Sequence, residues 1–415
     1  MSLMSSLKCL ECGQEYSAGE KLLKCRKCNG QLQVLYDYQE ASERLDRKEL
    51  KARRLGLWKY FELLPVMEKK NVVSLSEGGT PLRVCGRLNT ALDVKNLYLK
   101  DETRNPTGSF KDRPISVAIS KVLEFGGDTV VTASTGNVAA SVAAYAAVAN
   151  MRAYVFMPEK VPKNKMAQAL LFGAVVVLVP GSTADDSLRL SKQVAERYGW
   201  YPVATAAEMN PYTIEGNKTI AFEIIEQLEW ATPDWVVIPV GGGGNLGGNW
   251  KGFFEFQEMG LQESTPKIVG VQAEGCMPFV DAVRRGLKAD EIQPWPNPET
   301  IASGLADAYP CDCLQALKGI HNSRGTVEAV SDQDILEAIF LLAKTEGIFA
   351  EPAAAASIAA LKKLRENRTI DSSDLVVCEV TGSGLKQPSE ASEALEMPKL
   401  IPATLKDFEK TFLSR

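Results

Sequence analysis

The sequence predicts an α/β fold built on parallel sheets. From Thr129 onward, short β-rich runs alternate with helical patterns, as they do in parallel sheets covered by helices on both faces. Glycine-rich turns directly follow several of these runs, where loops at the carboxyl ends of strands are expected. Two Cys-x-x-Cys pairs near the N-terminus indicate a small additional unit.

The composition is that of an ordinary globular protein. The 415 residues are 45% hydrophobic and 24% charged, which is enough for two or three domains with a large core. A net charge of −5 gives no electrostatic footprint for nucleic acid. There is no apolar stretch of about 18 residues and no basic-then-apolar N-terminal segment. We therefore expect a cytoplasmic protein with no nucleic-acid or membrane partner.

The chain has a single histidine, His321. A catalytic dyad or a metal site built on several histidines is therefore excluded. Any proton transfer must use a lysine, a carboxylate, a hydroxyl or a cofactor phosphate.

Residues 1–40 resemble a zinc ribbon. Cys9, Cys12, Cys25 and Cys28 form two similar knuckles, each followed by a glycine or Asn-Gly turn that aims both sulfurs at one ion. Four thiolates bind Zn²⁺ tetrahedrally and leave no open position, so the zinc would be structural. The alternative is a ribbon without bound metal. Disulfides are disfavoured in a chain without secretion signals.

The remaining elements follow from periodicity. Residues 41–75, with Leu45, Leu50 and Leu55, predict a linker helix and an arm. A charged turn is expected at Lys100-Asp101-Glu102. Strands are predicted at 97–99, 129–132, 152–157, 174–179, 235–240, 268–273 and 375–380. Helices are predicted at 115–125, 138–149, 163–172, 185–198, 216–228, 248–257, 331–346 and 352–365.

Lys111 lies where a loop turns into a helix. It follows a Pro-Thr-Gly turn and Phe110, a setting that can hold an amine away from bulk water. A partly desolvated lysine loses its proton more readily, and the neutral amine can attack a carbonyl to form a Schiff base. A lysine taken alone is more often a surface charge.

Three further loops are expected at the carboxyl ends of strands. Residues 241–245, Gly-Gly-Gly-Gly-Asn, can bring backbone amides close to a phosphate, although the pattern is not a Walker A motif. Residues 134–137, Ser-Thr-Gly-Asn, can bind a carboxylate or simply cap a helix. Thr381 follows the last predicted strand and can place its hydroxyl beside a ligand.

Together these motifs resemble the threonine synthases, which belong to the tryptophan-synthase-β-like (fold type II) pyridoxal-phosphate enzymes. Asn-Pro-Thr-Gly-Ser-Phe-Lys-Asp-Arg, residues 105–113, is similar to the family's cofactor-lysine segment. Four separated motifs occur in the family's order between about Ser76 and about Pro388. The resemblance implies two parallel-sheet-containing α/β domains with the cofactor in the cleft between them. It also implies that threonine is made from O-phosphohomoserine and water.

The resemblance assigns roles to particular residues. Lys111 would be the catalytic residue that holds pyridoxal phosphate. Thr381 would face the pyridine nitrogen, and a hydroxyl there favours elimination over transamination because it does not demand a protonated ring. The cofactor-binding residues would be Phe110, Lys111, Asn137, Gly241, Gly242, Gly243, Gly244, Asn245 and Thr381. The substrate-binding residues would be Ser134, Thr135, Asn137 and Asn210.

The expected organisation has five parts and a homodimeric assembly. The parts are a zinc-ribbon-like module at 1–40, a linker helix and arm at 41–75, a large cofactor-binding domain at 76–125 and 205–390, a small α/β domain at 126–204, and a C-terminal tail at 391–415.

Two positions depart from the family pattern. Thr213 stands where an arginine usually helps to bind the substrate phosphate, and Ser383 stands where many members have histidine. The glycine loop also resembles the dehydratase version. Elimination from threonine or serine, giving a 2-oxo acid and ammonia, is therefore the alternative reaction. A ribbon-bearing binding protein with a decayed site is a third hypothesis, which the intact lysine and glycine loop disfavour.

Overall fold

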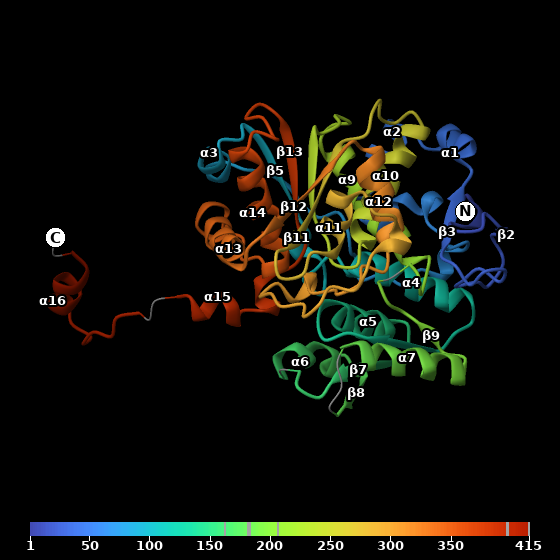
Figure 1. Cartoon of the computed structure of the whole chain (residues 1–415), viewed down its shortest axis with the longest axis horizontal. Helices are drawn as coiled ribbons and strands as arrows, with labels where there is room; N and C mark the ends of the chain where they lie inside the picture. The colour runs from blue at the N-terminus through green and yellow to red at the C-terminus, as the bar shows by residue number, and fades with distance from the viewer. Residues whose placement is uncertain (162, 181–183, 206, 396–397, 414–415) are drawn as a thin grey trace.

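Three β-sheets organise the chain. The computed structural model describes residues 1–415 except 162, 181–183, 206, 396–397 and 414–415, and it leaves out the side chains of 164, 184 and 185. In Figure 1 the largest sheet lies in the upper part of the molecule and the second sheet lies below it, while the third is beside the N-terminus.

The large sheet has six strands in the order β12-β11-β10-β13-β5-β4. All neighbouring strands are parallel except β4 and β5, which are antiparallel. The strands are β4 (Leu82–Val84), β5 (Asn96–Asp101), β10 (Trp235–Pro239), β11 (Lys267–Ala273), β12 (Thr326–Val330) and β13 (Leu375–Val380). Every residue of β10 is buried, as expected for a strand covered on both faces.

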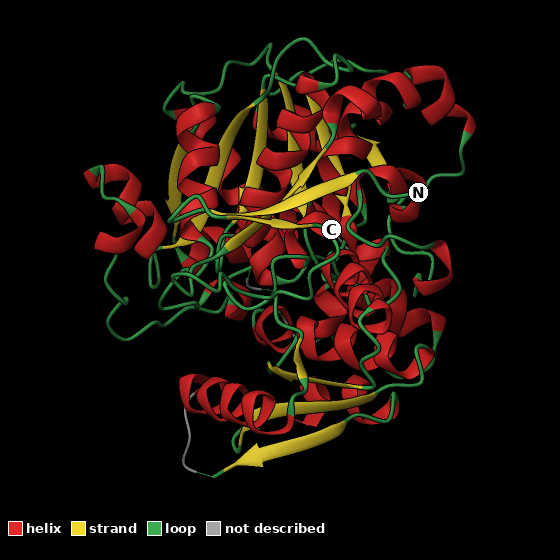
Figure 2. Ribbon diagram, turned by 90° about the vertical axis from the view of Figure 1, so that its right-hand side faces the viewer, coloured by secondary structure: helices red, strands yellow, loops and turns green. Residues whose placement is uncertain are grey.

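Helices cover both faces of this sheet (Figure 2). The helices of this region, which pack on the sheet or on one another, are α3 (Arg87–Leu92), α4 (Asp112–Glu124), α8 (Thr213–Asn217), α9 (Thr219–Gln227), α10 (Gly244–Glu258), α11 (Pro278–Arg285), α12 (Cys313–Asn322), α13 (Asp332–Glu346) and α14 (Pro352–Glu366). On one face Phe222 and Phe256 stack at 4.2 Å between ring centroids. On the other, the alanines of α14 are buried, and their small side chains allow close packing against the strands.

The second sheet is fully parallel, with the order β8-β7-β6-β9. Its strands are β6 (Thr129–Ala133), β7 (Arg152–Pro158), β8 (Val175–Val179) and β9 (Tyr201–Pro202). The helices of this region are α5 (Asn137–Val148), α6 (Lys163–Leu171) and α7 (Ala184–Tyr198). One mainly parallel sheet and one fully parallel sheet, each with covering helices, confirm the predicted α/β class.

The N-terminal module is a three-stranded antiparallel sheet of β1 (Met4–Cys9), β2 (Glu15–Ser17) and β3 (Leu32–Tyr36). The predicted linker helix is instead two short helices, α1 (Tyr38–Arg44) and α2 (Arg47–Ala52). The break occurs because Asp46 accepts a hydrogen bond from the backbone of Glu49 and so begins a new helix. Short 3₁₀ turns, Leu57–Leu63 and Lys69–Asn71, lead to the large sheet.

Several other boundaries differ from the sequence-based expectation. The helix predicted at 216–228 is two helices, α8 and α9, which join at Lys218. Helix α10 begins at Gly244, four residues before the predicted start, because the glycine loop itself forms the first turn. Beyond the large sheet, α15 (Ser389–Glu393) packs against α13, and α16 (Leu405–Phe408) lies on a C-terminal arm that extends away from the body (Figure 1).

Candidate active site

The predicted lysine segment lies against the loop that follows β13. The backbone N–H of Phe110 donates to the carbonyl of Thr381 at 2.9 Å, and the N–H of Ser383 donates to the carbonyl of Gly108 at 2.9 Å. Lys111 follows directly and precedes the first residue of α4. These bonds hold Lys111 at the carboxyl end of the large sheet, where parallel sheets bind ligands.

The Lys111 amine is partly buried. Its Nζ donates to Thr205 Oγ1 at 3.2 Å and lies 4.4 Å from the centre of the Phe110 ring. Burial lowers the pKa of Lys111, although the nearby carboxylates of Asp307 and Glu351 oppose this shift. The amine is therefore closer to its neutral, nucleophilic form than an exposed lysine is.

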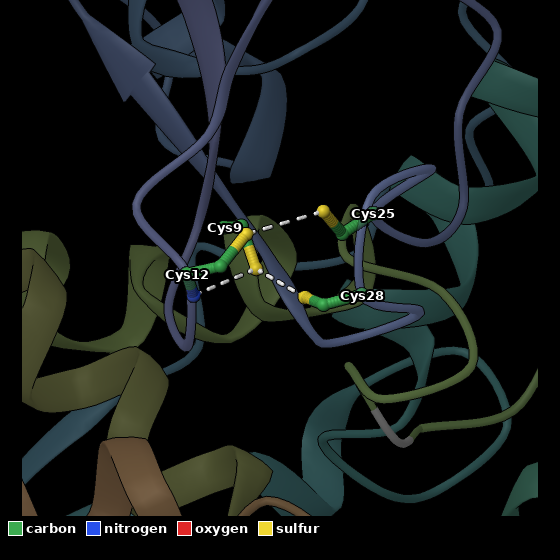
Figure 3. A group of neighbouring side chains, drawn as sticks. All are labelled: Cys9, Cys12, Cys25 and Cys28. Atoms are coloured by element: carbon green, nitrogen blue, oxygen red, sulfur yellow. Dashed lines mark hydrogen bonds between the residues drawn. The ribbon is translucent and has the colours of Figure 1, made fainter.

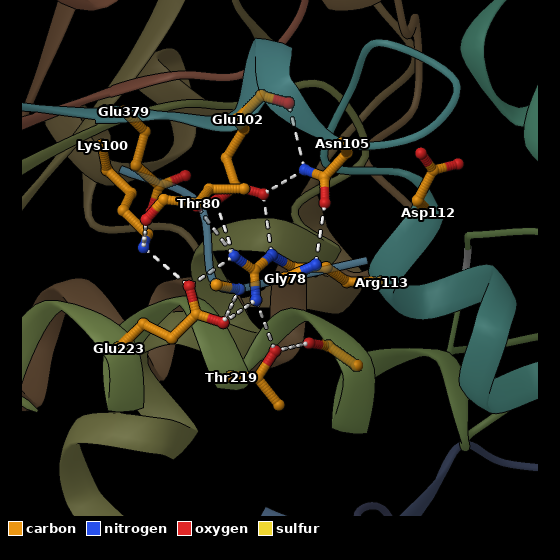
Figure 4. Close-up of polar contacts among 12 residues, drawn as sticks. Gly78, Thr80, Lys100, Glu102, Asn105, Asp112, Arg113, Thr219, Glu223 and Glu379 are labelled. Carbon is orange, nitrogen blue, oxygen red and sulfur yellow. Dashed lines mark hydrogen bonds and ion pairs between the residues drawn. The ribbon is translucent and has the colours of Figure 1, made fainter. Parts of the chain in front are cut away.

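Beneath the lysine segment lies a buried ionic network centred on Arg113 (Figure 4). Its guanidinium donates to both oxygens of Glu102 at 2.7 and 2.8 Å and to both oxygens of Glu223 at 2.8 and 2.7 Å. Lys100 Nζ also donates to Glu223 at 2.7 Å. Burial alone would raise the pKa of Glu223, but Arg113 and Lys100 outweigh it and lower that pKa.

The prediction of a charged turn at residues 100–102 is therefore wrong. Lys100 and Asp101 belong to β5, and all three residues are buried. A buried charge is tolerated when it is paired and fully hydrogen-bonded, and here the partners come from α4 and α9. The network fixes α4, and hence Lys111, against the large sheet.

The glycine loop joins β10 to α10. Gly243 has φ +97°, a left-handed conformation that L side chains rarely adopt. A Cβ on Gly241 would lie 2.7 Å from Asp307 Oδ2, and one on Gly244 would lie 2.5 Å from Asp312 Oδ2. Gly241, which also lies 2.7 Å from the backbone oxygen of Gly304 by the same measure, and Gly243 are therefore the positions that most clearly require glycine. The loop is therefore lined by the backbone amides at the start of α10. A helix N-terminus of this kind binds phosphate well.

The Ser134–Asn137 loop leads into α5. Gly136 N donates to Ser134 Oγ at 3.3 Å, and Thr135 lies between these residues. Asn137 Nδ2 donates to both oxygens of Glu351, at 2.9 and 3.0 Å. Burial raises the pKa of Glu351, while the Asn137 amide opposes the shift.

Thr381 is buried directly after β13. Two residues earlier on this strand, Glu379 Oε2 accepts a hydrogen bond of 2.6 Å from Asn245 Nδ2, the last residue of the glycine-loop motif. Burial raises the pKa of Glu379 to about 8. The strand that carries Thr381 is thus tied to the glycine loop through a carboxyl group that is largely neutral at pH 7.

Asn210 and Thr213 lie at the start of α8 and are both buried. Asn210 Nδ2 donates to Pro202 O at 3.2 Å and its Oδ1 accepts from Tyr212 N at 3.1 Å. Thr213 Oγ1 donates to Asn210 O at 2.8 Å. The Thr213 side chain is thus engaged with the backbone of its own segment, and the Asn210 side chain also binds the end of β9.

The four N-terminal cysteines point toward one another (Figure 3), and all four sulfur atoms lie within 4.8 Å of one another. The Sγ atoms of Cys9 and Cys28 are 3.5 Å apart, and those of Cys12 and Cys25 are 3.6 Å apart. A tetrahedron with Zn–S bonds of about 2.3 Å has edges of about 3.8 Å, so the spacing fits a four-thiolate metal site.

Three residues near Lys111 escaped the sequence reasoning. Glu351 and Asp312 immediately precede α14 and α12, so from sequence alone they are helix-start residues. Thr205 lies in a loop after β9 with no motif around it. Only the fold brings these residues to Lys111.

Comparison with known proteins agrees with this fold. Residues 73–382 match the family described as "Pyridoxal-phosphate dependent enzyme". Among solved structures, the processed form of threonine deaminase isoform 2 from Solanum lycopersicum aligns with a TM-score of 0.65 and 26% identity, over 76% of this chain and 82% of that one. The protein is thus a pyridoxal-phosphate-dependent enzyme.

Relatives identified by sequence show which family of pyridoxal-phosphate-dependent enzymes the chain belongs to. The threonine synthase of Methanocaldococcus jannaschii is 45% identical over 94% of this chain and 95% of the relative. The threonine synthase of Methanosarcina acetivorans is 44% identical over 97% of both chains. The chain therefore belongs to the threonine synthase family. Within the part of the chain that the structure describes, no helix is long and apolar enough to cross a membrane.

Proposed function

We propose that this enzyme is a threonine synthase, which converts O-phosphohomoserine and water into threonine and phosphate. The observation that carries the proposal is the partly buried Lys111 amine with its lowered pKa, held by Phe110 and the β13 loop at the end of a parallel sheet. The high identity to two archaeal threonine synthases over nearly the whole chain supports the choice of substrate.

The residues present fit pyridoxal phosphate. When bound, the cofactor withdraws electrons from the substrate α-carbon and makes protons on the adjoining carbons acidic. Lys111 would hold its carbonyl carbon and the amides of the glycine loop its phosphate. Asn137 would face the ring hydroxyl, and Thr381 the ring nitrogen. The close approach of neighbouring atoms to Gly241 and Gly244 supports the phosphate assignment, because it leaves backbone amides rather than side chains to line the loop.

The chain's own groups would then carry the proton transfers. The Lys111 amine, once free, moves protons at Cα, Cβ and Cγ of the substrate. Phosphate leaves from Cγ, and water adds at Cβ. Ser134 and Thr135 hold the substrate carboxylate and keep Cα near the Lys111 amine. The lowered pKa of Lys111 suits an amine that must both take and return a proton near neutral pH.

The same proposal covers the remaining parts of the molecule. Cys9, Cys12, Cys25 and Cys28 would hold one structural Zn²⁺. The chain would divide into the module 1–40, the linker 41–75, the large domain 76–125 with 205–390, the small domain 126–204 and the tail 391–415. We further propose a cytoplasmic homodimer that acts on a free amino acid.

Elimination from threonine or serine is a second candidate because of Thr213. A threonine at this position provides no guanidinium to bind the distal phosphate of the substrate. The Thr213 hydroxyl is itself engaged, because its Oγ1 donates to Asn210 O. The structural similarity to the threonine deaminase of Solanum lycopersicum also supports this candidate.

Parallel turnover assays decide between the two reactions. Purified enzyme is supplied separately with O-phosphohomoserine, threonine and serine, and threonine, phosphate and 2-oxo acid are measured. We expect threonine and phosphate in equal amounts from the first substrate, and a loss of about 10²- to 10⁴-fold or more for Lys111→Ala. Formation of 2-oxo acid from threonine or serine without turnover of O-phosphohomoserine would select the second candidate.

A further inference from the structure

The carboxyl group of Asp312 faces the glycine loop from the start of α12. The side chain is fully buried at the start of α12. Its Oδ1 accepts hydrogen bonds from Ala207 N at 2.7 Å and Glu208 N at 3.3 Å. Its Oδ2 has no hydrogen-bond partner among the described residues. A buried polar atom in this position is expected to meet a ligand or a water molecule.

The unpartnered oxygen is directed at the glycine loop. Asp312 Oδ2 lies 2.5 Å from the point where a Cβ on Gly244 would be, and Asp312 N donates to Gly242 O at 2.8 Å. A Cβ on Gly243 would lie 3.1 Å from the Asp312 backbone. Gly242, Gly243 and Gly244 therefore all lie against Asp312. A phosphate bound to the amides of this loop would lie next to Asp312 Oδ2.

We propose that the Asp312 carboxyl group donates a hydrogen bond to the phosphate of pyridoxal phosphate, so that cofactor binding weakens as pH rises through neutrality. A carboxylate could only repel a phosphate dianion, whereas a carboxylic acid can donate a short, strong O–H···O bond to it. The proposal rests on the cofactor site proposed above, and it does not depend on which substrate the enzyme uses.

The surroundings favour the neutral form of Asp312. Burial raises the pKa of Asp312 to about 7, and the carboxylate of Glu208 acts in the same direction. The backbone N–H donors and the Lys111 cation act against this shift. Two further ionisable side chains face this region, Asp307 and Cys311; burial raises the pKa of the Cys311 thiol, so it stays neutral.

Binding of a non-covalent cofactor analogue isolates the phosphate contact. The probe is 4-deoxypyridoxine 5′-phosphate, which lacks the carbonyl and so cannot link to Lys111. Its Kd is measured by equilibrium dialysis over roughly pH 6 to 9 for the wild-type chain and for Asp312→Asn. In the wild type we expect the Kd to rise by about tenfold per pH unit above a midpoint near neutrality. In Asp312→Asn, whose amide still donates but does not titrate, this rise should disappear.

Two controls separate this contact from a general structural effect. 4-Deoxypyridoxine, which lacks the phosphate group, should bind with the same affinity to the wild type and to Asp312→Asn at every pH. Glu208→Gln removes a neighbouring carboxylate and keeps Asp312, so the rise should persist with its midpoint at lower pH. Asp312→Asn is nearly isosteric, so it carries the test even if Asp312→Ala does not fold.

The outcomes are distinct. A rise in Kd with pH that is equal in wild type and Asp312→Asn would overturn the proposal, and so would a wild-type Kd that is independent of pH. Both results would leave the cofactor site itself intact. Failure of the wild type to bind the phosphorylated probe at any pH would instead refute the proposed function.

Discussion

The polar side chains around Lys111 have lost most of their contact with water, and their ionisation reflects that loss. Burial raises the pKa of Asp112 to about 6, even though Thr107 and Ser141 donate to it. Burial likewise raises the pKa of Asp312 to about 7 and that of Glu379 to about 8. Each group adds stability when protonated, which is lost as pH rises through these values. Small changes in pH near neutrality therefore change the charge of the site.

Thr381 is predicted to keep the reaction on the elimination and replacement path. Thr381→Asp would place a negative charge beside the ring nitrogen and favour its protonation. The ring would then stabilise carbanions at Cα more broadly, and transamination should increase relative to threonine formation. Product partition is measured for the wild type and the variant, with cofactor occupancy checked in each.

Thr381→Ala is the matched control for this charge effect. It removes one hydrogen bond, so cofactor affinity should fall by roughly tenfold without a change in partition. If the Asp variant binds cofactor and partitions as the wild type does, Thr381 does not face the ring nitrogen.

Among the secondary-structure elements, the N-terminal module and helices α8 and α10 form a shared polar interface. Tyr36 OH, on β3, donates to Glu215 Oε2 at 2.8 Å, and Tyr38 OH donates to Glu255 Oε1 at 3.1 Å. Lys218 bridges the two carboxylates, with Nζ 2.6 Å from Glu215 and 2.8 Å from Glu255. These charges are fully buried, so removing one partner would cost about 3–5 kcal/mol of stability.

This interface is connected to the glycine loop by a hydrogen bond. Asn217, two residues after Glu215 on α8, donates through Nδ2 to Gly244 O at 3.1 Å. Helix α10, which carries Glu255, begins at that same glycine. The module therefore supports the helices that hold the proposed phosphate site, and a zinc ion bound to its four cysteines would stabilise the fold beyond the module itself.

The four-cysteine site is predicted to bind one zinc ion. Protein expressed with zinc should contain about one equivalent per chain, measured by metal analysis. Replacing Cys9 and Cys12 together by Ser removes two of the four ligands and should abolish tight binding, because structural zinc contributes about 10–16 kcal/mol in such modules. Cys85→Ala, which changes a buried cysteine outside the module, should keep the metal. Retention of zinc by the double Ser variant would contradict the assignment.

In the molecule as a whole, contacts join the two parallel sheets around Lys111. Lys386 Nζ, in the loop after β13, donates to Gln168 Oε1 on α6 at 2.7 Å and to Thr107 O at 2.7 Å. Lys165, also on α6, donates from its Nζ to Ser303 Oγ at 3.4 Å. Helix α6 of the second sheet thus contacts loops of the large sheet on the side where Lys111 lies.

Much of this architecture was predictable from the sequence because its signals are local. The buried strand β10 is a continuous apolar run, and the glycines that follow it mark the loop where α10 begins. The interior polar groups were not predictable, since their partners are distant in the chain. Lys100 pairs with Glu223, and Asn137 pairs with Glu351, more than a hundred residues away in each case. The run of three charged residues at 100–102 therefore suggested a turn at the surface, because nothing in the sequence indicates the buried partner of Lys100.

The assignment of Lys111 as the cofactor lysine is the central claim, and reductive labelling tests it most directly. Purified enzyme with bound pyridoxal phosphate is treated with borohydride, digested, and mapped by mass spectrometry. We expect the visible absorbance of the cofactor to disappear and the pyridoxyl label to be found on Lys111. The label should be absent from Lys111→Ala. A label on Lys386, Lys165 or any other lysine in the wild-type protein would contradict the assignment and with it the proposed site.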